Sequence, residues 1–336
     1  MVKKIIIILI LVIISTILSI CIGSIFISPK EIGAILLYKF FNIEIINIDK
    51  INADIINIRL QHSILSLFVG ASLSITGVVI QSILRNPLAS AYNLGISSGA
   101  GLGAALLIVM HISFNQYFFI GISMIFAFIT IIFILFISNR IDKYMSNNSI
   151  ILAGIVISLF LNSVMSFLSY MFPKYSNQII LWQLGSLFVR NKLDILIIIF
   201  ITIVFLLVLM KYSSVLDIMT FGDETSLSLG IDVKKMRVFF ILISSFITAV
   251  LVAFTGIIGF VDLVSPHIAR KMFGAKHIIV FPMAALIGGL LLNISDIFSR
   301  IIVQGSNIPI GIVTAVIGAP FFLYVFISNK NMKGIN

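Results

Sequence analysis

Long apolar runs separated by short polar segments make up most of the chain. The run at residues 195–210 does not alternate apolar and polar residues, as a membrane β-barrel strand does, so it predicts a helix. A helix needs about 20 apolar residues to cross a bilayer. The pattern therefore predicts about ten membrane spans, at residues 5–27, 61–81, 94–112, 117–138, 149–171, 193–211, 236–255, 257–273, 277–297 and 309–328. The first run is longer than the apolar part of a signal peptide and has no small-x-small cleavage site, which favours a membrane helix.

Composition supports an all-α, polytopic membrane protein. Of the 336 residues, 60% are hydrophobic and 10% are charged, and the mean hydropathy is +1.22. Soluble domains have about 45–50% apolar and about 25% charged residues, so the composition excludes an aqueous enzyme, a nucleic-acid-binding domain and a disordered chain. The longest polar connections, about 28–60, 172–192 and 212–235, are too short for a soluble domain. We therefore expect residues 1–336 to form a single transmembrane domain, in which the only cysteine, Cys21, excludes an internal disulfide.

The net charge of +10 is distributed unevenly between the two predicted sides of the membrane. Ten spans place both termini on one side, and that side then carries 14 of the 22 Lys and Arg residues, against 8 on the other. Because cytoplasmic loops are enriched in Lys and Arg, we expect both termini to be cytoplasmic.

The block at residues 70–105 is rich in small residues. Gly70, Ser74 and Gly77, and then Gly99 and Gly103, recur at three- and four-residue spacing. This spacing lets helices approach closely in lipid and by itself indicates ordinary helix packing.

The order of residues in this block, and in four later segments, resembles the FecCD permease family. These proteins are the membrane subunits of binding-protein-dependent ABC importers for iron–siderophore complexes, haem and cobalamin. The matching motifs lie in order between residues 59 and 322. They include Gly77, Gln81, Arg85, Asn86, Pro87, Gly95 and Gly99; Trp182 with Gly185-Ser186-Leu187; Gly259, Pro266, His267 and Arg270; Asp296 and Arg300; and Pro309, Gly311 and Pro320.

The resemblance implies a permease of type II ABC importer architecture, not an enzyme, in the cytoplasmic membrane of a prokaryote. It implies a homodimer, two copies of an ATP-binding subunit and an extracytoplasmic substrate-binding protein. The expected cargo is an iron(III)–siderophore chelate, with cobalamin, haem or an oxyanion as alternatives. An ion-coupled secondary transporter, or a membrane enzyme using Asp262 and His267, are the alternatives from other classes.

The polar connection at residues 212–235 is the candidate coupling segment. We expect two short helices, the first capped by Asp223 or Thr225 and ended by Gly230. From its residues alone, it is either a solvated loop or a docking element. The resemblance implies docking on the ATP-binding subunit, through Gly222, Asp223, Glu224, Ser226, Leu229 and Gly230.

The chain contains no Gly-x-x-x-x-Gly-Lys-Ser/Thr motif, so it has no P-loop to hold a triphosphate. We expect ATP and Mg²⁺ to be bound by the partner subunit, and no cofactor by this chain. No Cys, His and carboxylate spacing indicates a permanently bound metal.

Basic residues at the predicted outer ends of the spans form the candidate binding-protein site. The resemblance implies that Arg59 and Arg300 meet acidic residues of the binding protein; His62 stands where the family has a second arginine. The alternative for each is an anchor at the lipid headgroups. Asp262 stands where the family usually has Gly, and we interpret it as the cap of a broken helix.

Overall fold

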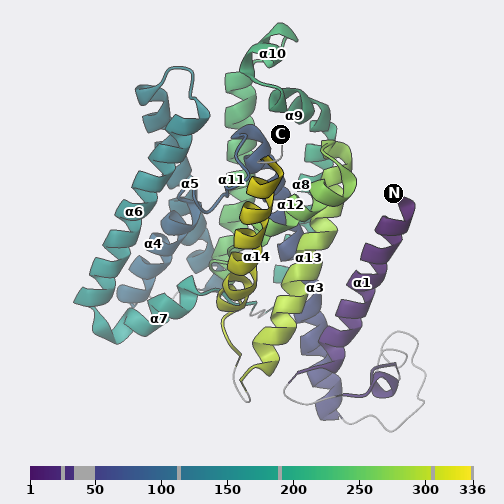
Figure 1. The fold of residues 1–336 in the computed structure, drawn as a ribbon. Helices are drawn as coiled ribbons and strands as arrows, with labels where there is room; N and C mark the ends of the chain where they lie inside the picture. Colours follow the sequence, from purple (N-terminus) through teal and green to yellow (C-terminus); the bar gives the residue numbers. More distant parts are fainter. Residues whose placement is uncertain (24–26, 34–49, 112–114, 188–190, 304–306, 334–336) are drawn as a thin grey trace.

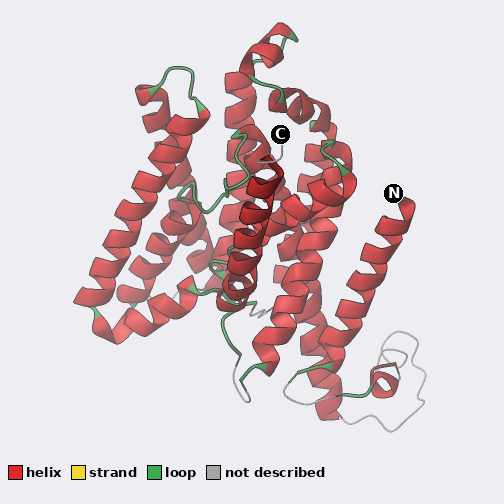
Figure 2. Ribbon diagram, in the orientation of Figure 1, coloured by secondary structure: helices red, strands yellow, loops and turns green. Residues whose placement is uncertain are grey.

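The computed structural model describes residues 1–23, 27–33, 50–111, 115–187, 191–303 and 307–333. Helices dominate these residues and no strand occurs in them (Figure 2). The helices are α1 (Val2–Cys21), α3 (Lys50–Ile83), α4 (Ile96–Val109), α5 (Gln116–Ile141), α6 (Asn147–Met171), α7 (Pro173–Gln183), α8 (Lys192–Lys211), α9 (Ser213–Thr220), α10 (Asp223–Ser228), α11 (Val233–Thr255), α12 (Val261–Phe273), α13 (His277–Ile301) and α14 (Ile310–Lys333). The all-α prediction is confirmed.

Seven of these helices are long and apolar enough to cross a membrane: α1, α3, α5, α6, α8, α11 and α13. Two others, α4 and the Ile310–Leu323 part of α14, are apolar but shorter, and α12 has only 13 residues. Each predicted span thus coincides with a helix, while the number of complete crossings stays a prediction. The predicted first span extends over residues 24–26, which lie outside the described residues.

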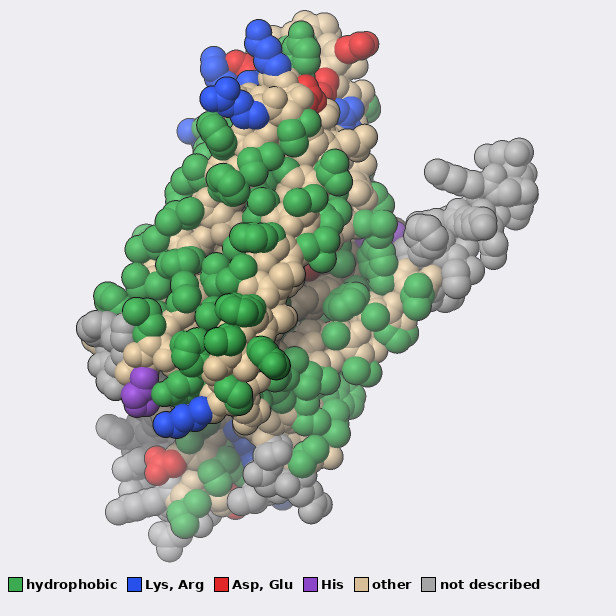
Figure 3. Space-filling model, turned by 90° about the vertical axis from the view of Figure 1, so that its left-hand side faces the viewer, with side chains coloured by type: hydrophobic (Ala, Val, Ile, Leu, Met, Phe, Trp, Pro, Cys, Tyr) green, Lys and Arg blue, Asp and Glu red, His purple; other side chains and the backbone are tan. Residues whose placement is uncertain are grey.

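The helices form a bundle with two distinct ends (Figure 1). α9 and α10 lie at one end, which we call the α10 end, and α7 lies at the other, which we call the α7 end. The start of α1 and the C-terminal end of α14 both point toward the α10 end. In the face shown in Figure 3, a wide band of hydrophobic side chains separates the ends, and Lys and Arg side chains gather at the α10 end. This is the surface of a protein whose middle lies in lipid.

α3 runs through the centre of the bundle and packs against α1, α8, α11, α12 and α13. Its contact with α13 is close because Gly70 and Gly288 face each other, and a Cβ on either glycine would meet the backbone of the other helix. In lipid, where apolar side chains gain little from leaving their solvent, such backbone approach is a main source of helix association.

Polar side chains also connect the central helices. Asn293 of α13 accepts hydrogen bonds from the hydroxyls of Ser63 and Ser66 on α3, at 3.2 and 3.0 Å, and its amide donates to Ser15 of α1 at 3.1 Å. All four side chains are buried. A polar group in hydrocarbon is costly without a partner, so this cluster fixes the rotation of α1, α3 and α13 relative to one another.

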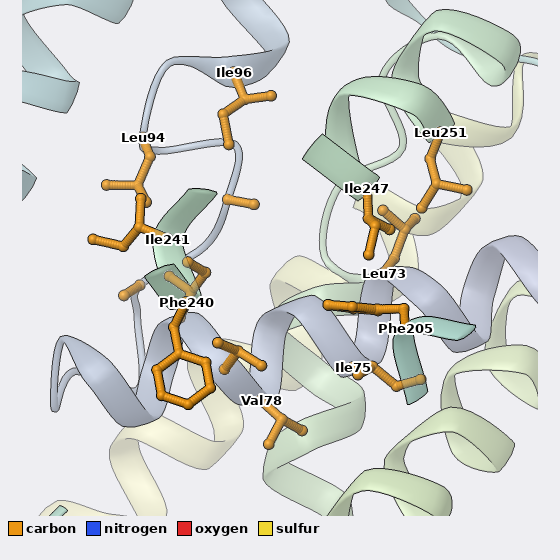
Figure 4. Packing of buried hydrophobic residues seen from close by; sticks show 14 of the residues in the cluster. Leu73, Ile75, Val78, Leu94, Ile96, Phe205, Phe240, Ile241, Ile247 and Leu251 are labelled. Carbon is orange, nitrogen blue, oxygen red and sulfur yellow. The ribbon is translucent and has the colours of Figure 1, made fainter. Parts of the chain in front are cut away.

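The apolar core lies around α3 and α11 (Figure 4). Leu73 and Val78 of α3, Phe205 of α8, and Phe240 and Ile247 of α11 are each at most 3% exposed. These side chains come from helices far apart in sequence, so the core joins the coupling segment's flanking helices, α8 and α11, to the central helix.

Non-helical backbone near the α7 end is satisfied by other backbone. Ser186 donates its N–H to Thr255 at 2.7 Å, Ile310 to Gly185 at 3.1 Å, and Gly311 to Leu184 at 3.0 Å. These bonds tie the segment after α7 to the last residue of α11 and to the first turn of α14. Irregular backbone at membrane depth is tolerated where protein groups replace water in this way.

Candidate functional site

The coupling segment contains two short helices and projects from the bundle at the α10 end (Figure 1). The helix predicted to come first, before Gly230, is the second of them, α10, and α9 precedes it. Gly222 precedes α10 with φ 122°, and Gly230 follows it with φ 81°. Gly230 donates to Leu227 and Ile231 donates to Ser226, each at 3.0 Å, which closes the helix. Gly230 therefore ends α10 as predicted, because only glycine adopts this left-handed backbone without strain.

The predicted cap of α10 is wrong. Gly222 occupies the N-cap position and has no side chain, while Asp223 is the first helical residue and Thr225 lies inside the helix. The hydroxyl of Ser226 is buried and donates to the Gly222 carbonyl at 2.7 Å. α10 therefore has no side-chain cap, and the carboxylate of Asp223 points to two arginines instead.

Asp223 pairs with Arg85, just after α3, and with Arg237, near the start of α11. Nη2 of Arg237 donates to both carboxylate oxygens, at 3.0 and 2.9 Å, and its Nη1 donates to the Met145 carbonyl at 2.8 Å. Arg237 is only 1% exposed, although Asp223 is partly open to solvent. One carboxylate thus fastens the coupling segment to two spans.

Arg237 is the residue of this site that sequence analysis missed. It lies one position inside the predicted span 236–255, and a charge within an apolar span was the available signal. The next cap along the chain is ordinary: Asp232 accepts the N–H of Lys235 at 3.1 Å and caps α11. That N–H, together with the Lys235 ammonium group, lowers the pKa of Asp232 below its usual value.

α10 and the residues that flank it carry exposed apolar side chains beside an acidic one. Phe221 is 76% exposed, Leu227 60% and Leu229 61%, and Glu224 is exposed next to them. In the part of the chain that the structure describes, nothing covers these apolar side chains at the projecting end, so the surface suits the docking of another protein.

At the α7 end, the structure places Arg59 and Arg300 inside the chain, at the end of α1. Nη1 of Arg59 donates to the carbonyls of Ile20 and Cys21, at 3.0 and 3.1 Å. Arg59 is 6% exposed and Arg300 is 9% exposed. These guanidinium groups bind the unsatisfied carbonyls at the C-terminus of a helix, a position that also favours positive charge. Their docking to a binding protein stays a prediction.

A cavity of about 330 Å³ lies beside Arg300. His62, Asp296 and Arg300 line it, together with the segments 185–187 and 307–310. Arg300 and Asp296 form an ion pair with 2.9 Å between Nη2 and Oδ2, and His62 Nδ1 lies 3.7 Å from the other carboxylate oxygen. The structure thus brings two of the three predicted docking residues together around one buried carboxylate.

The motif residues Gly77, Gln81 and Arg270 form one contact between α3 and α12. A Cβ on Gly77 would meet the backbone carbonyl of Asp262, so the two helices touch there. The Gln81 amide donates to the same carbonyl at 3.2 Å, and Nη1 of Arg270 donates to Gln81 Oε1 at 2.5 Å. Pro266 is buried within α12, and His267 is half-buried.

Asp262 is 1% exposed and lies against Ser90 and Ala91 in the first turn of α12. Neither carboxylate oxygen makes a well-formed hydrogen bond within the described residues, and Phe260 is the N-cap. The interpretation of Asp262 as a helix cap is therefore wrong. Gly259, just before Phe260, has open space where a Cβ would stand.

Three motif residues shape the connection between α3 and α4. Asn86 accepts the N–H of Leu88 at 2.9 Å, in the turn that contains Pro87. Gly95 has φ 77° and precedes α4, and Gly99 packs on Thr130 of α5 so closely that a Cβ would clash. These positions set the path of the backbone and carry no chemistry of their own.

The remaining motif residues lie near the irregular segments or in α14. Trp182 packs edge-on against Phe119, with ring centroids 6.4 Å apart. Pro309 lines the cavity beside Arg300, and Gly311 lies against the carbonyls of Leu184 and Ile257. Pro320 lies inside α14 and is exposed. Within the described residues, no cluster of three or more His, Cys, Asp or Glu residues could hold a metal ion.

This bundle of long apolar helices, with short helices projecting at one end, is that of a multi-pass membrane protein. The model of the FecCD transport family matches residues 10–328, and the chain belongs to that family. It is 34% identical to the Fe(3+)-citrate import system permease protein YfmE of Bacillus subtilis over 96% of this chain and 93% of that protein.

Two further proteins show the same relationship. The hemin transport system permease protein HmuU of Yersinia pestis is 32% identical over 83% of this chain and 84% of its own length. A solved inward-facing structure, assigned to a metal-chelate type ABC transporter, has a TM-score of 0.84 and 27% identity, and covers 98% of this chain and 100% of its own. The chain is thus a permease subunit of an ABC importer for an iron chelate, haem or cobalamin, and works with ATPase and binding-protein partners.

Proposed function

We propose that the chain carries an iron(III)–siderophore chelate through the membrane as one of two identical permease subunits. The observation that supports the iron chelate is the similarity to an iron(III)-citrate permease over nearly the full length of both chains. In this proposal the chain binds no cofactor, and ATP and Mg²⁺ act on the partner ATPase.

In this proposal the α10 end is cytoplasmic, together with both termini. Exposed Arg140, Lys143, Lys211, Lys234 and Lys235 lie at that end or in the connections leading to it, in agreement with the positive-inside rule. The exposed apolar side chains of α10 then face the cytoplasm, where an ATP-binding subunit can cover them. The α7 end, with Arg59, His62 and Arg300, faces the binding protein.

The exposed polar side chains of α6 support the proposal that two copies of the chain act together. Outside the first two turns and the last turn of each of the seven spans, exposed polar side chains occur among the described residues only on α6, as Asn162, Ser163 and Ser166. Lipid is a poor neighbour for an exposed amide, and each of the other spans buries such groups or leaves them partly covered. We assign this face to a polar pathway between two copies of the chain. This face of α6 carries no charged side chain. It can therefore form hydrogen bonds to a charged cargo without binding it tightly through an ion pair.

Ligand binding by the cognate binding protein tests the cargo. Purified binding protein is titrated with ferric citrate, a ferric hydroxamate, haemin and cyanocobalamin, and binding is followed by quenching of intrinsic fluorescence. We expect submicromolar binding of a ferric chelate alone. Tight binding of haemin or cyanocobalamin, with no response to either ferric chelate, would replace the iron–siderophore assignment.

Thiol accessibility tests the pathway. Cys21 is the only cysteine, so Cys21→Ala gives a background without thiols. In it, Ser163→Cys and Ser166→Cys should react in membranes with a charged, water-soluble methanethiosulfonate reagent. Leu196→Cys on α8, an apolar position 59% exposed, is the lipid-facing control and should react at least about tenfold more slowly. Equal, slow reaction at all three positions would place the α6 face in lipid and contradict the pathway.

A further inference from the structure

A continuous row of polar contacts runs from the coupling segment to the first turn of α12. It begins at Asp217 on α9, which no motif contains. Oδ1 of Asp217 accepts the backbone N–H of His277 at 3.0 Å and contacts its ring Nδ1 at 2.5 Å. Since a carboxylate only accepts, Nδ1 is the donor in the second contact. Asp217 thus joins α9 to the start of α13.

The row continues through α3. Nε2 of His277 lies 2.6 Å from the hydroxyl oxygen of Ser82, and Nη2 of Arg270 donates to the same oxygen at 3.0 Å. Ser82 is therefore the point where α13 and α12 meet on α3. Nη1 of Arg270 then bonds to Gln81, whose amide donates to the Asp262 carbonyl.

Burial makes these contacts specific. His277 is 2% exposed, Gln81 4% and Ser82 6%, and Arg270 is partly buried. Arg270 has no carboxylate partner among the described residues, and its guanidinium donates to Gln81, Ser82 and the Val78 carbonyl instead. Buried polar groups hold a single arrangement because leaving any one unpaired is costly, so a shift at one end strains the next contact.

We propose that Asp217, His277, Ser82, Arg270 and Gln81 form a relay that positions α12 according to the position of α9. The proposal rests on the coupling role of residues 212–235 and adds the residues that act inside the membrane. α12 is suited to respond, because it is short, begins at a left-handed Phe260 and touches α3 at Gly77. A displacement of α9 by the ATPase then reaches a broken helix beside the membrane core.

His277→Asn breaks the relay at Ser82 but keeps the contact between α9 and α13. The asparagine amide can take the place of Nδ1 at Asp217, and the backbone bond that fastens α9 to α13 is kept. The group facing Ser82 is lost. Ser82→Ala breaks the same row one step further on. The matched control is Ser295→Ala, because Ser295 is also a buried serine, but its hydroxyl bonds only to the carbonyl of Leu291 in its own helix.

Hydrogen–deuterium exchange on the purified permease tests the relay without any partner. Asp217→Ala, His277→Asn and Ser82→Ala should each raise exchange in residues 261–265 by about fivefold, the effect of losing one buried hydrogen bond. Ser295→Ala should leave those residues unchanged. If Asp217→Ala alone prevents folding, the two milder variants decide the result. Increases confined to α9 and the first turn of α13 would overturn the relay.

Transport with the ATPase and the binding protein in liposomes gives the second readout. Each single variant should lower the substrate carried per ATP hydrolysed at least about fivefold, and His277→Asn combined with Ser82→Ala should be no worse than either alone, since both break one row. Additive losses would indicate two separate structural defects and overturn the relay. If the wild-type chain binds no ATPase, the proposed function fails, while the exchange result stands independently.

Discussion

Arg300 on α13 is bonded to Ser19 on α1. Its Nη1 donates to the Ser19 carbonyl at 3.0 Å, and its Nη2 donates to the Ser19 hydroxyl at 2.7 Å. The same guanidinium is paired with Asp296, and both side chains are buried. Arg300 and Arg59 together bind the carbonyls at the C-terminus of α1. Arg300, which the sequence predicts to face a binding protein, is therefore also part of the bundle's own structure.

Arg300→Ala should lower the free energy of unfolding by about 3–5 kcal/mol, because it leaves Asp296 as an unpaired buried charge. Asp296→Asn combined with Arg300→Gln should recover part of that loss, since no buried charge remains. Thermal unfolding in detergent measures both. Equal stability of wild type and Arg300→Ala would contradict the structural role.

Docking is measured separately, as the affinity of the binding protein for membranes at low ionic strength. Arg300→Glu should weaken it by more than the ~1 kcal/mol typical of an exposed pair, because an attraction becomes a repulsion. The comparison uses Arg300→Gln, which removes the charge without reversing it. Identical affinities for wild type and Arg300→Glu would show that Arg300 serves the bundle alone.

Gly230→Val should uncouple ATP hydrolysis from transport while the protein still inserts into the membrane. The left-handed backbone at Gly230 is strained for a β-branched residue, so the end of α10 must rearrange. Among the described residues, a Cβ at this position would meet no atom within 4 Å apart from its chain neighbours, so a steric clash is not the cause. Gly230→Asn is the matched control, because asparagine tolerates this backbone, and it should keep most activity. Unchanged transport in Gly230→Val would remove the coupling role.

Gly77→Ala should destabilise the protein by about 1–3 kcal/mol, the usual cost of overpacking, because its methyl group would meet the backbone of Asp262. Gly121→Ala on α5 is the control, since that position faces open space, and it should be neutral or slightly stabilising. Thermal unfolding of the two variants in one detergent compares them. Similar transition temperatures would mean that α3 and α12 do not touch at this point.

Asp262→Asn should retain most transport. The carboxylate is buried without a well-formed hydrogen bond, and a neutral amide costs less to bury than a charge. Its stability should therefore equal or exceed that of wild type. Uptake measured in cells with matched protein levels tests this. A loss beyond about tenfold would show that an ionised carboxylate is needed at this position.

The hydrophobic pattern was sufficient to predict the helices, because each apolar run needs its own backbone hydrogen bonds in lipid. It predicted a helix at each proposed span, while the number of complete crossings stays a prediction, and the order of motifs predicted the family. The position of α9 was not predicted. Gly230 was read correctly as a helix end, since a left-handed glycine is a local property of the chain.

The partners of the charged side chains were decided only by the tertiary structure. Asp223 was expected to cap its own helix, but α3 and α11 bring Arg85 and Arg237 to it, and the carboxylate binds them instead. Neither Asp217 nor Ser82 was a candidate residue in the sequence, yet His277 connects them. The neighbouring sequence of a charged side chain favours a cap or a surface position. In a membrane bundle, however, a buried charge binds the unsatisfied polar groups that packing places near it, and those groups come from helices distant in sequence.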